Sequence, residues 1–226
     1  MIYENIKSGR FLSRPNRFIA HVEIDGRAEI CHVKNTGRCR ELLVPGAAVI
    51  VQEAGNLNRS TKYDLIAVYK GGRLINMDSQ APNRVFSEWL KSAELFGNIT
   101  LIRPEYTYKS LRFDFYVEAD GKRILAEVKG VTLEENGIVL FPDAPTQRGV
   151  KHLLELCESM KDGYCAYIAF IIQMEGVRYF TPNNGTHKEF GDALKAAQAC
   201  GVRILALDCR VTEDSLTVKD SVEVRL

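Results

Sequence analysis

The pattern of apolar and turn-forming residues changes near residue 81, and any fold must satisfy both patterns. Before this point, short apolar segments alternate with turn residues such as Asp25-Gly26 and Pro45-Gly46. Pairs of this kind are typical of hairpin turns and loops. We predict strands at Arg17–Ile24, Arg27–Lys34, Ala47–Glu53, Lys62–Tyr69 and Arg73–Met77. Five short strands favour a small barrel of the OB type, although another antiparallel barrel or sandwich fits the same pattern.

After residue 81, helical periodicity alternates with strand-like segments. Helices are predicted from Pro82 to Leu95, from about Thr146 to Lys161 and from about His187 to Cys200. The expected strands are Ile99–Tyr108, Leu111–Glu118, Lys122–Val131, Tyr164–Gln173, Val177–Phe180 and Val202–Asp208, with one hairpin in the last fifteen residues. This order predicts an α/β domain with a mixed sheet. We expect two domains, 1–80 and 81–226, packed together without a flexible linker.

Composition excludes several classes of protein. With 46% hydrophobic and 26% charged residues, the chain is neither disordered nor collagen-like. The longest apolar run, Cys165–Ile172, is far shorter than the ~20 residues of a membrane-spanning helix. No apolar stretch follows the first residues, so we expect no secretory signal and a cytoplasmic location. The six cysteines form no C-x-x-C pair, which favours reduced thiols over a zinc site.

The net charge of +1 argues against binding through bulk positive charge. The charge is nevertheless uneven, because residues 1–80 hold 12 Lys and Arg against 8 Asp and Glu. A modestly basic N-terminal half is compatible with a nucleic-acid partner.

Polar side chains interrupt two apolar strands that the turn at Asp120-Gly121 joins. Successive side chains of a strand point to opposite faces. We expect one face of the first strand to carry Leu111, Phe113, Phe115 and Val117, and the other Arg112, Asp114 and Tyr116. Glu127 and Lys129 share a face of the second strand. If the strands pair, Asp114, Glu127 and Lys129 converge on one polar patch.

Two carboxylates and a lysine in this arrangement can hold Mg²⁺ beside a phosphate, because Mg²⁺ takes oxygen ligands and keeps several waters. The lysine would orient or deprotonate an attacking water and stabilise negative charge. Glu88, at the border of the apolar face of the first helix, could add a third carboxylate. The plainer alternative is an exposed Glu127–Lys129 ion pair and a solvated Asp114. A central strand favours the metal site, since buried charges are costly.

Several longer motifs resemble one family. They are EVKGVTLEENGIVLFPDAPTQRGVKHLLELCE from Glu127, RPNRFIAHV from Arg14, HVKNTGR from His32, TKYDLIAV from Thr61, DSQAPNRV from Asp78 and RFDFYV from Arg112. Together they span nearly the whole chain, which resembles the sugar fermentation stimulation protein (SfsA) family. The resemblance implies an OB-like domain followed by a domain of the PD-(D/E)xK nuclease fold. It also implies DNA binding, which we expect to lack sequence specificity, and regulation of sugar utilisation genes.

The same resemblance places the nuclease motif on Asp114, Glu127 and Lys129, with Mg²⁺ or Mn²⁺ as the expected metal. Phe113 precedes Asp114 where the motif has proline.

The stretch that follows the nuclease motif leads into the second helix. The resemblance includes Asp143, Thr146, Arg148 and His152 in the family signature. Helix N-termini favour anions, so Arg148 and the free N–H groups there could bind a phosphate. The alternatives are helix capping for Asp143 and Thr146, and a surface position for His152 on the polar side of the helix.

Basic residues of the N-terminal half lie near turns and strand ends. The candidates for nucleic-acid binding are Arg14, Arg17, Lys34, Arg38 and Arg40. OB-type barrels bind single strands through such groups and through stacking aromatic rings, here Phe11, Phe18 and Tyr63. The alternative is a solvated basic surface.

Three hypotheses follow from the sequence. The first is a DNA-binding protein with a working metal-dependent nuclease site. The second is a non-catalytic DNA-binding regulator with a vestigial site. The third is an OB-type module that binds a protein partner.

Overall fold

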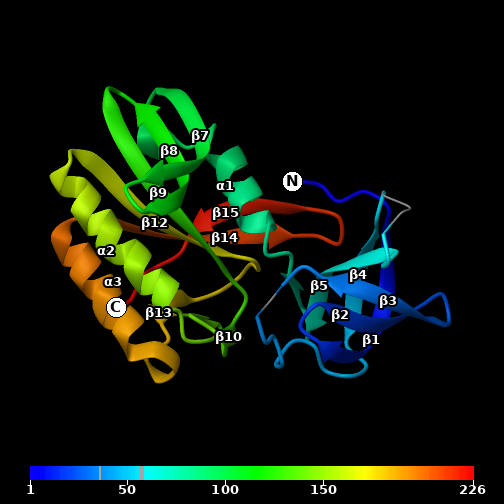
Figure 1. The fold of residues 1–226 in the computed structure, drawn as a ribbon. Helices are drawn as coiled ribbons and strands as arrows, with labels where there is room; N and C mark the ends of the chain where they lie inside the picture. Colours follow the sequence, from blue (N-terminus) through cyan, green and yellow to red (C-terminus); the bar gives the residue numbers. More distant parts are fainter. Residues whose placement is uncertain (36, 56–58) are drawn as a thin grey trace.

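The computed structural model describes residues 1–35, 37–55 and 59–226, which form a barrel and an α/β part side by side (Figure 1). The barrel strands are β1 (Ile6–Asn16), β2 (Ile19–Ile24), β3 (Arg27–Val33), β4 (Ala48–Glu53), β5 (Tyr63–Lys70) and β6 (Arg73–Asn76). Their order is β3-β2-β1-β4-β5-β6, and a parallel pairing of β3 with β5 closes the first five into a barrel. The expected barrel is confirmed.

The sequence does not predict the N-terminal strand β1, because the first expected strand begins at Arg17. The fifth expected strand, Arg73–Met77, is β6, which extends the sheet beside β5. The first half of β1, Ile6–Arg10, pairs with β4 but shows no apolar alternation. Gly9 lies so close to β2 that an added Cβ would come within 2.6 Å of Val22 Cγ1. A long-range contact therefore requires this glycine, and local sequence patterns do not show it.

The α/β part is built on a mixed sheet in the order β15-β14-β12-β9-β8-β7. Its strands are β7 (Ile99–Tyr108), β8 (Leu111–Ala119), β9 (Lys122–Val131), β12 (Tyr164–Ile172), β14 (Arg203–Val211) and β15 (Leu216–Ser221). β12 runs parallel to both β9 and β14, whereas β8 and β15 run antiparallel to their neighbours. The predicted mixed α/β architecture is confirmed.

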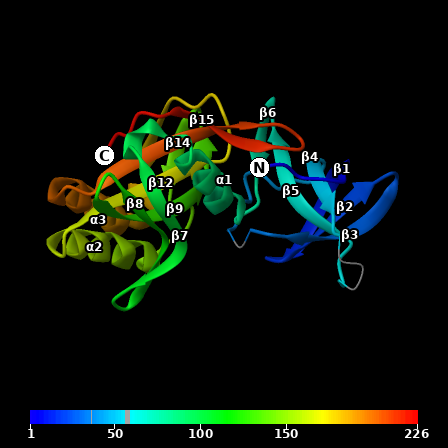
Figure 2. The same ribbon diagram turned by 90° about the horizontal axis from the view of Figure 1, so that it is seen from above.

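Helices cover both faces of this sheet (Figure 2). One face packs on α1 (Ala81–Leu90), and the other on α2 (Gln147–Lys161) and α3 (Asn184–Cys200). The first helix ends at Leu90 rather than Leu95, and a short 3-10 helix, η1 (Glu94–Phe96), follows it. A small sheet of β10 (Glu134–Glu135), β11 (Ile138–Phe141) and β13 (Tyr179–Pro182) completes this part, and its first two strands were not predicted. No helix of the described residues is long and apolar enough to cross a membrane.

The expected alternation along β8 is wrong around Asp114. Phe113 and Tyr116 both belong to the core on the side of α2, where Phe113 contacts His152, whereas Phe115 contacts Phe86 of α1 on the other side. The β8–β9 ladder ends at the pair Phe115–Ala126, so the strand is free to change its course there. This irregularity lies beside the predicted nuclease motif.

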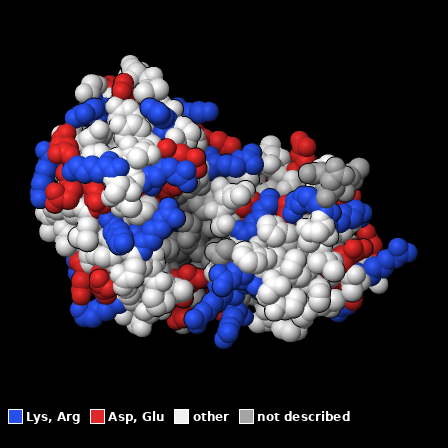
Figure 3. Space-filling view, viewed as in Figure 1, with Lys and Arg blue, Asp and Glu red and all other residues white. Residues whose placement is uncertain are grey.

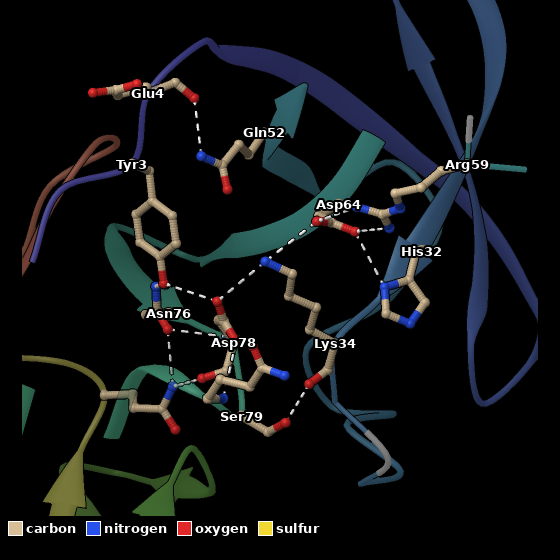
Figure 4. A network of polar contacts seen from close by, with 12 residues as sticks. Tyr3, Glu4, His32, Lys34, Gln52, Arg59, Asp64, Asn76, Asp78 and Ser79 are labelled. Atoms are coloured by element: carbon tan, nitrogen blue, oxygen red, sulfur yellow. Dashed lines mark hydrogen bonds and ion pairs between the residues drawn. The ribbon is translucent and has the colours of Figure 1, made fainter. Parts of the chain in front are cut away.

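A buried polar network joins the barrel to the α/β part (Figure 4). The Tyr3 hydroxyl accepts a hydrogen bond from Asn76 Nδ2 at 2.9 Å. The Gln173 side chain donates to Asn76 Oδ1 at 2.9 Å and to the Asp78 carbonyl at 3.0 Å. The first residues also pack on the α/β part, where Ile2 bridges to Ser215. The domain boundary near residue 81 stays a prediction.

Asp64 lies at the barrel end of this network. Burial alone would raise its pKa, but Arg59, Lys34 and His32 outweigh burial and lower the pKa from 3.8 to about 2. The ionised form is thus stabilised by folding, and this stability is lost as the pH falls from about 4 to about 2. We expect Asp64→Asn to lower the free energy of unfolding at pH 6 by about 2 kcal/mol.

Urea unfolding across this pH range measures the effect. The difference between wild type and Asp64→Asn should shrink below pH ~4. The matched control is Asp25→Asn, at an exposed turn residue with φ of 52°, which should change stability by less than about 0.5 kcal/mol. A difference that stays constant down to pH ~2 would contradict the assignment.

Candidate functional site

Asp114 lies where β8 leaves β9 and is fixed by two donors. Its Oδ2 accepts a hydrogen bond from the backbone N–H of Val128 at 2.8 Å. Its Oδ1 accepts from Asn83 Nδ2 of α1 at 2.8 Å. The first contact places Asp114 beside the residue that follows Glu127. That the two acids hold one cation stays a prediction.

Glu127 and Lys129 share one face of the central strand β9. Lys129 Nζ lies 2.5 Å from Glu127 Oε1, and the Glu127 side chain is only 3% exposed. The alternative of a solvated surface ion pair therefore does not describe this contact.

His152 of α2 reaches the same carboxylate, which corrects its expected surface position. Its Nδ1 lies 2.5 Å from Glu127 Oε1, and its side chain is 1% exposed. The ring packs edge-on against Phe113, with the centroids 5.7 Å apart. The polar character of His152 concealed that its partner is a buried acid on β9.

The pKa values of the two acids move in opposite directions. Burial raises the pKa of Asp114, and the nearby charge of Glu127 raises it further. Burial would also raise the pKa of Glu127, but His152 and Lys129 outweigh it and lower that pKa. Glu127 is therefore held ionised. A cation beside both carboxylates would stabilise the ionised form of Asp114.

Buried polar atoms without hydrogen-bond partners indicate where a water or an ion would bind. In the described part of the chain, four buried side-chain polar atoms lack an aligned hydrogen bond. One of them, Glu127 Oε2, belongs to this site and has no hydrogen-bond partner. Another, His152 Nδ1, lies 2.5 Å from Glu127 Oε1 without an aligned hydrogen bond. Unsatisfied buried groups in native structures often signal a water or an ion. The acidic Oε2 is a ligand of the kind that hard divalent cations prefer.

Asp114 and Glu127 fit such a cation as a pair of carboxylates. No cluster of three His, Cys, Asp or Glu suited to a metal occurs within residues 1–35, 37–55 and 59–226. Mg²⁺ is commonly held by one or two carboxylates and keeps several waters, so two acids suffice.

Glu88 does not join the two acids, contrary to the expectation of a third carboxylate. Its Oε2 lies 2.6 Å from the amino group of Met1, in a pocket between α1 and β15. This partner is distant in sequence, and helical periodicity could not reveal it.

The N-terminus of α2 carries two of the predicted residues. Thr146 caps the helix, because its Oγ1 accepts a hydrogen bond from Gly149 N at 3.1 Å. Arg148 is exposed, and its Nε donates to His152 Nε2 at 3.3 Å. Asp143 is exposed and faces the barrel loop, where an added Cβ on Gly37 would lie 2.7 Å from its Oδ2. Capping thus describes Thr146 but not Asp143.

Two of the predicted nucleic-acid-binding residues serve the barrel itself. The Arg14 guanidinium donates to the backbone carbonyls of Arg17, Asn35, Gly37 and Arg38. Lys34 Nζ lies 3.2 Å from Asp64 Oδ2 and 3.6 Å from Asp78 Oδ2 (Figure 4). We therefore revise the expectation for Arg14 and Lys34, whose charges are committed to internal contacts.

Arg17, Arg38 and Arg40 remain exposed around a hollow of about 660 Å³. This hollow also touches Ala144 of the loop before α2, so it lies between the barrel and the α/β part. Lys and Arg side chains border the depression between the two parts on both sides (Figure 3). The aromatic prediction holds for one ring: Phe18 is 49% exposed, whereas Phe11 and Tyr63 are buried in the barrel core.

Comparisons with known proteins identify both parts of the chain. The model described as "Sugar fermentation stimulation protein RE domain" matches residues 80–215, and "SfsA N-terminal OB domain" matches residues 12–77. The chain belongs to the SfsA family.

Relatives within the SfsA family align along the whole chain. A "Sugar fermentation stimulation protein homolog" of Ruminiclostridium cellulolyticum is 61% identical, with 100% of both chains covered. One of Desulfitobacterium hafniense is 63% identical, covering 100% of this chain and 99% of the relative. The structure of Pyrococcus furiosus SfsA in complex with Ca²⁺ matches with a TM-score of 0.90 at 26% identity, covering 100% of this chain and 98% of that one.

Sequence reasoning missed one residue of this SfsA site. Asn83, which holds Asp114, lies in the DSQAPNRV motif on the apolar first helix. An amide beside the predicted apolar stripe was the available signal, but its partner 31 positions away was not visible.

Proposed function

We propose that this protein binds DNA and hydrolyses phosphodiester bonds at Asp114, Glu127 and Lys129, with Mg²⁺ or Mn²⁺ held by the two acids. The observation that carries this proposal is the buried Glu127 Oε2, which has no hydrogen-bond partner and belongs to a carboxylate whose charge raises the pKa of Asp114. The Ca²⁺ of the Pyrococcus furiosus relative supports a divalent cation, since Ca²⁺ and Mg²⁺ both take oxygen ligands. A cytoplasmic location belongs to the same proposal.

The cation, Lys129 and Arg148 would each have a separate role in hydrolysis. When bound, the cation lowers the pKa of a water ligand and neutralises charge on the phosphate. Lys129, which contacts Glu127 Oε1, would orient the attacking water and donate to a phosphate oxygen. The exposed Arg148 at the first turn of α2 would bind a neighbouring phosphate. As the water oxygen bonds to phosphorus, the bond to the leaving oxygen breaks.

Arg17, Arg38 and Arg40 would hold the nucleic-acid backbone in the hollow next to α2. Contacts of this kind carry no base information, so we infer binding without sequence specificity. The exposed Phe18 adds a ring for stacking on an unpaired base.

A second candidate function is a DNA-binding regulator of sugar utilisation without catalysis. The names of the relatives favour it, since they refer to stimulation of sugar fermentation.

One experiment separates the two functions. Purified protein is incubated with single- and double-stranded DNA and with RNA, in EDTA or with Mg²⁺, Mn²⁺ or Ca²⁺, and each sample is tested for mobility shift and cleavage. We expect a shift without metal, and cleavage with Mn²⁺ or Mg²⁺. A shift without cleavage under every metal would leave the regulator, and the lack of any shift would exclude both.

A further inference from the structure

His152 is the most deeply buried polar group beside the carboxylate pair, and the proposed hydrolysis does not use it. It lies between two charged residues: Glu127 Oε1 is 2.5 Å from Nδ1, and Arg148 Nε is 3.3 Å from Nε2. The edge-on contact with Phe113 fixes the plane of the ring. Arg148, His152 and Glu127 thus form a chain that leads from the surface of α2 to the interior of the sheet.

The contact with Arg148 determines which ring nitrogen carries the proton. A guanidinium group only donates hydrogen bonds, so Nε2 must accept, and the proton of a neutral ring lies on Nδ1. The protonated Nδ1 lies 2.5 Å from Glu127 Oε1 and cannot at the same time ligate a metal through a lone pair. His152 therefore acts on the carboxylate rather than on a cation.

The two oxygens of Glu127 have different surroundings. Oε1 lies 2.5 Å from both Lys129 Nζ and His152 Nδ1. Oε2 is equally buried but has no partner. A carboxylate held at one oxygen cannot rotate to exchange the two, so the free oxygen keeps a fixed direction.

We propose that His152 is a positioning residue, which holds Oε1 of Glu127 so that Oε2 stays free for a divalent cation, with Arg148 fixing its tautomer. This inference rests on the proposed function, because it assumes that a cation binds at Asp114 and Glu127. Groups that orient a metal ligand typically change metal affinity or activity by about 10- to 100-fold when removed.

The test measures binding of Mn²⁺ and Ca²⁺ by calorimetry in the absence of DNA. His152→Phe keeps a ring against Phe113 but removes Nδ1–H, and we expect metal affinity to fall by about 10-fold or more. His152→Asn restores an N–H near the position of Nδ1, so it should recover part of the affinity. Urea unfolding in EDTA checks that each variant is folded.

Arg148→Met provides a second test that does not disturb the interior. Arg148 is exposed, and without DNA a role limited to phosphate binding would not weaken metal binding. Removing a nearby positive charge would by itself strengthen the binding of a cation. Weaker binding in Arg148→Met, by up to about 10-fold, therefore identifies the loss of the tautomer contact.

The outcomes distinguish this inference from the proposed function. If wild type binds metal and both His152→Phe and Arg148→Met bind it more weakly, with His152→Asn intermediate, the positioning role is supported. If wild type binds metal and the folded variants bind it equally well, the positioning role is wrong and the proposed function stands. If wild type binds neither metal, both are wrong. Should His152→Phe not fold, an unchanged or higher affinity in Arg148→Met would overturn the inference.

Discussion

Replacing Asp114 by asparagine is expected to abolish metal-dependent cutting of DNA while the chain stays folded. The substitution removes one of the two carboxylates proposed to hold the cation and leaves the size of the side chain unchanged. Because the remaining acid alone cannot keep the cation positioned against the phosphate, we expect the rate of cutting to fall by about 10³-fold or more. The rate with Mn²⁺ and a labelled DNA strand measures this loss.

The stability of the same variant should move in the opposite direction. Burial, followed by the charge of Glu127, raises the pKa of Asp114, so the ionised carboxylate is disfavoured in the metal-free fold. A neutral asparagine avoids this cost. Its amide oxygen can accept from Val128 N, and Asn83 can turn its own amide to accept from the new NH₂ group. The free energy of unfolding in EDTA should therefore be no lower than that of wild type.

Glu118→Gln is the matched control for this prediction. Glu118 lies on the same strand and accepts a hydrogen bond from the Tyr116 hydroxyl at 2.6 Å, outside the proposed site. This variant should cut DNA at the wild-type rate. Cutting by Asp114→Asn at that rate would show that the observed nuclease does not use Asp114.

The sequence predicts the central strands of the α/β part well because their signals are local. The turn at Asp120-Gly121 and the spacing of Glu127 and Lys129 lie within one hairpin, and the observed strands agree to within about one residue. The polar character of the site follows from the same pattern, since two residues apart means one face of a strand.

The remaining parts of the site depend on contacts between distant segments. His152 belongs by residue type to the polar side of α2, and only its partner Glu127, from another element, draws it inside. Glu88 instead accepts a hydrogen bond from the amino group of Met1, 87 positions away, and so lies apart from the site. The face of Asp114 depends on where the β8–β9 ladder ends, which no single-strand pattern contains. Periodicity assigns faces to regular elements and fails where tertiary contacts override it.

DNA binding is expected to weaken steeply with added salt, and Arg17 and Arg38 should account for much of this dependence. Both are exposed at the hollow between the barrel and α2, whereas Arg14 and Lys34 are held by internal partners. Each phosphate neutralised on duplex DNA contributes about −0.9 to the slope of log affinity against log salt. The double variant Arg17→Ala/Arg38→Ala should reduce the steepness of that slope by about 2 and weaken binding roughly tenfold at low salt.

Fluorescence anisotropy with a random duplex at 50 to 200 mM salt gives the slope for each protein. The charge-matched control is Lys122→Ala/Lys195→Ala, because Lys122 is exposed at the turn between β8 and β9, Lys195 is exposed on α3, and neither lines the hollow. An equal loss of slope in both double variants would mean that the overall charge of the protein sets its affinity. Because the net charge is only +1, such a result would require weak binding at physiological salt. A loss confined to the Arg17 and Arg38 variant instead places the nucleic-acid backbone at the hollow beside Ala144, in the loop that leads into α2 and Arg148.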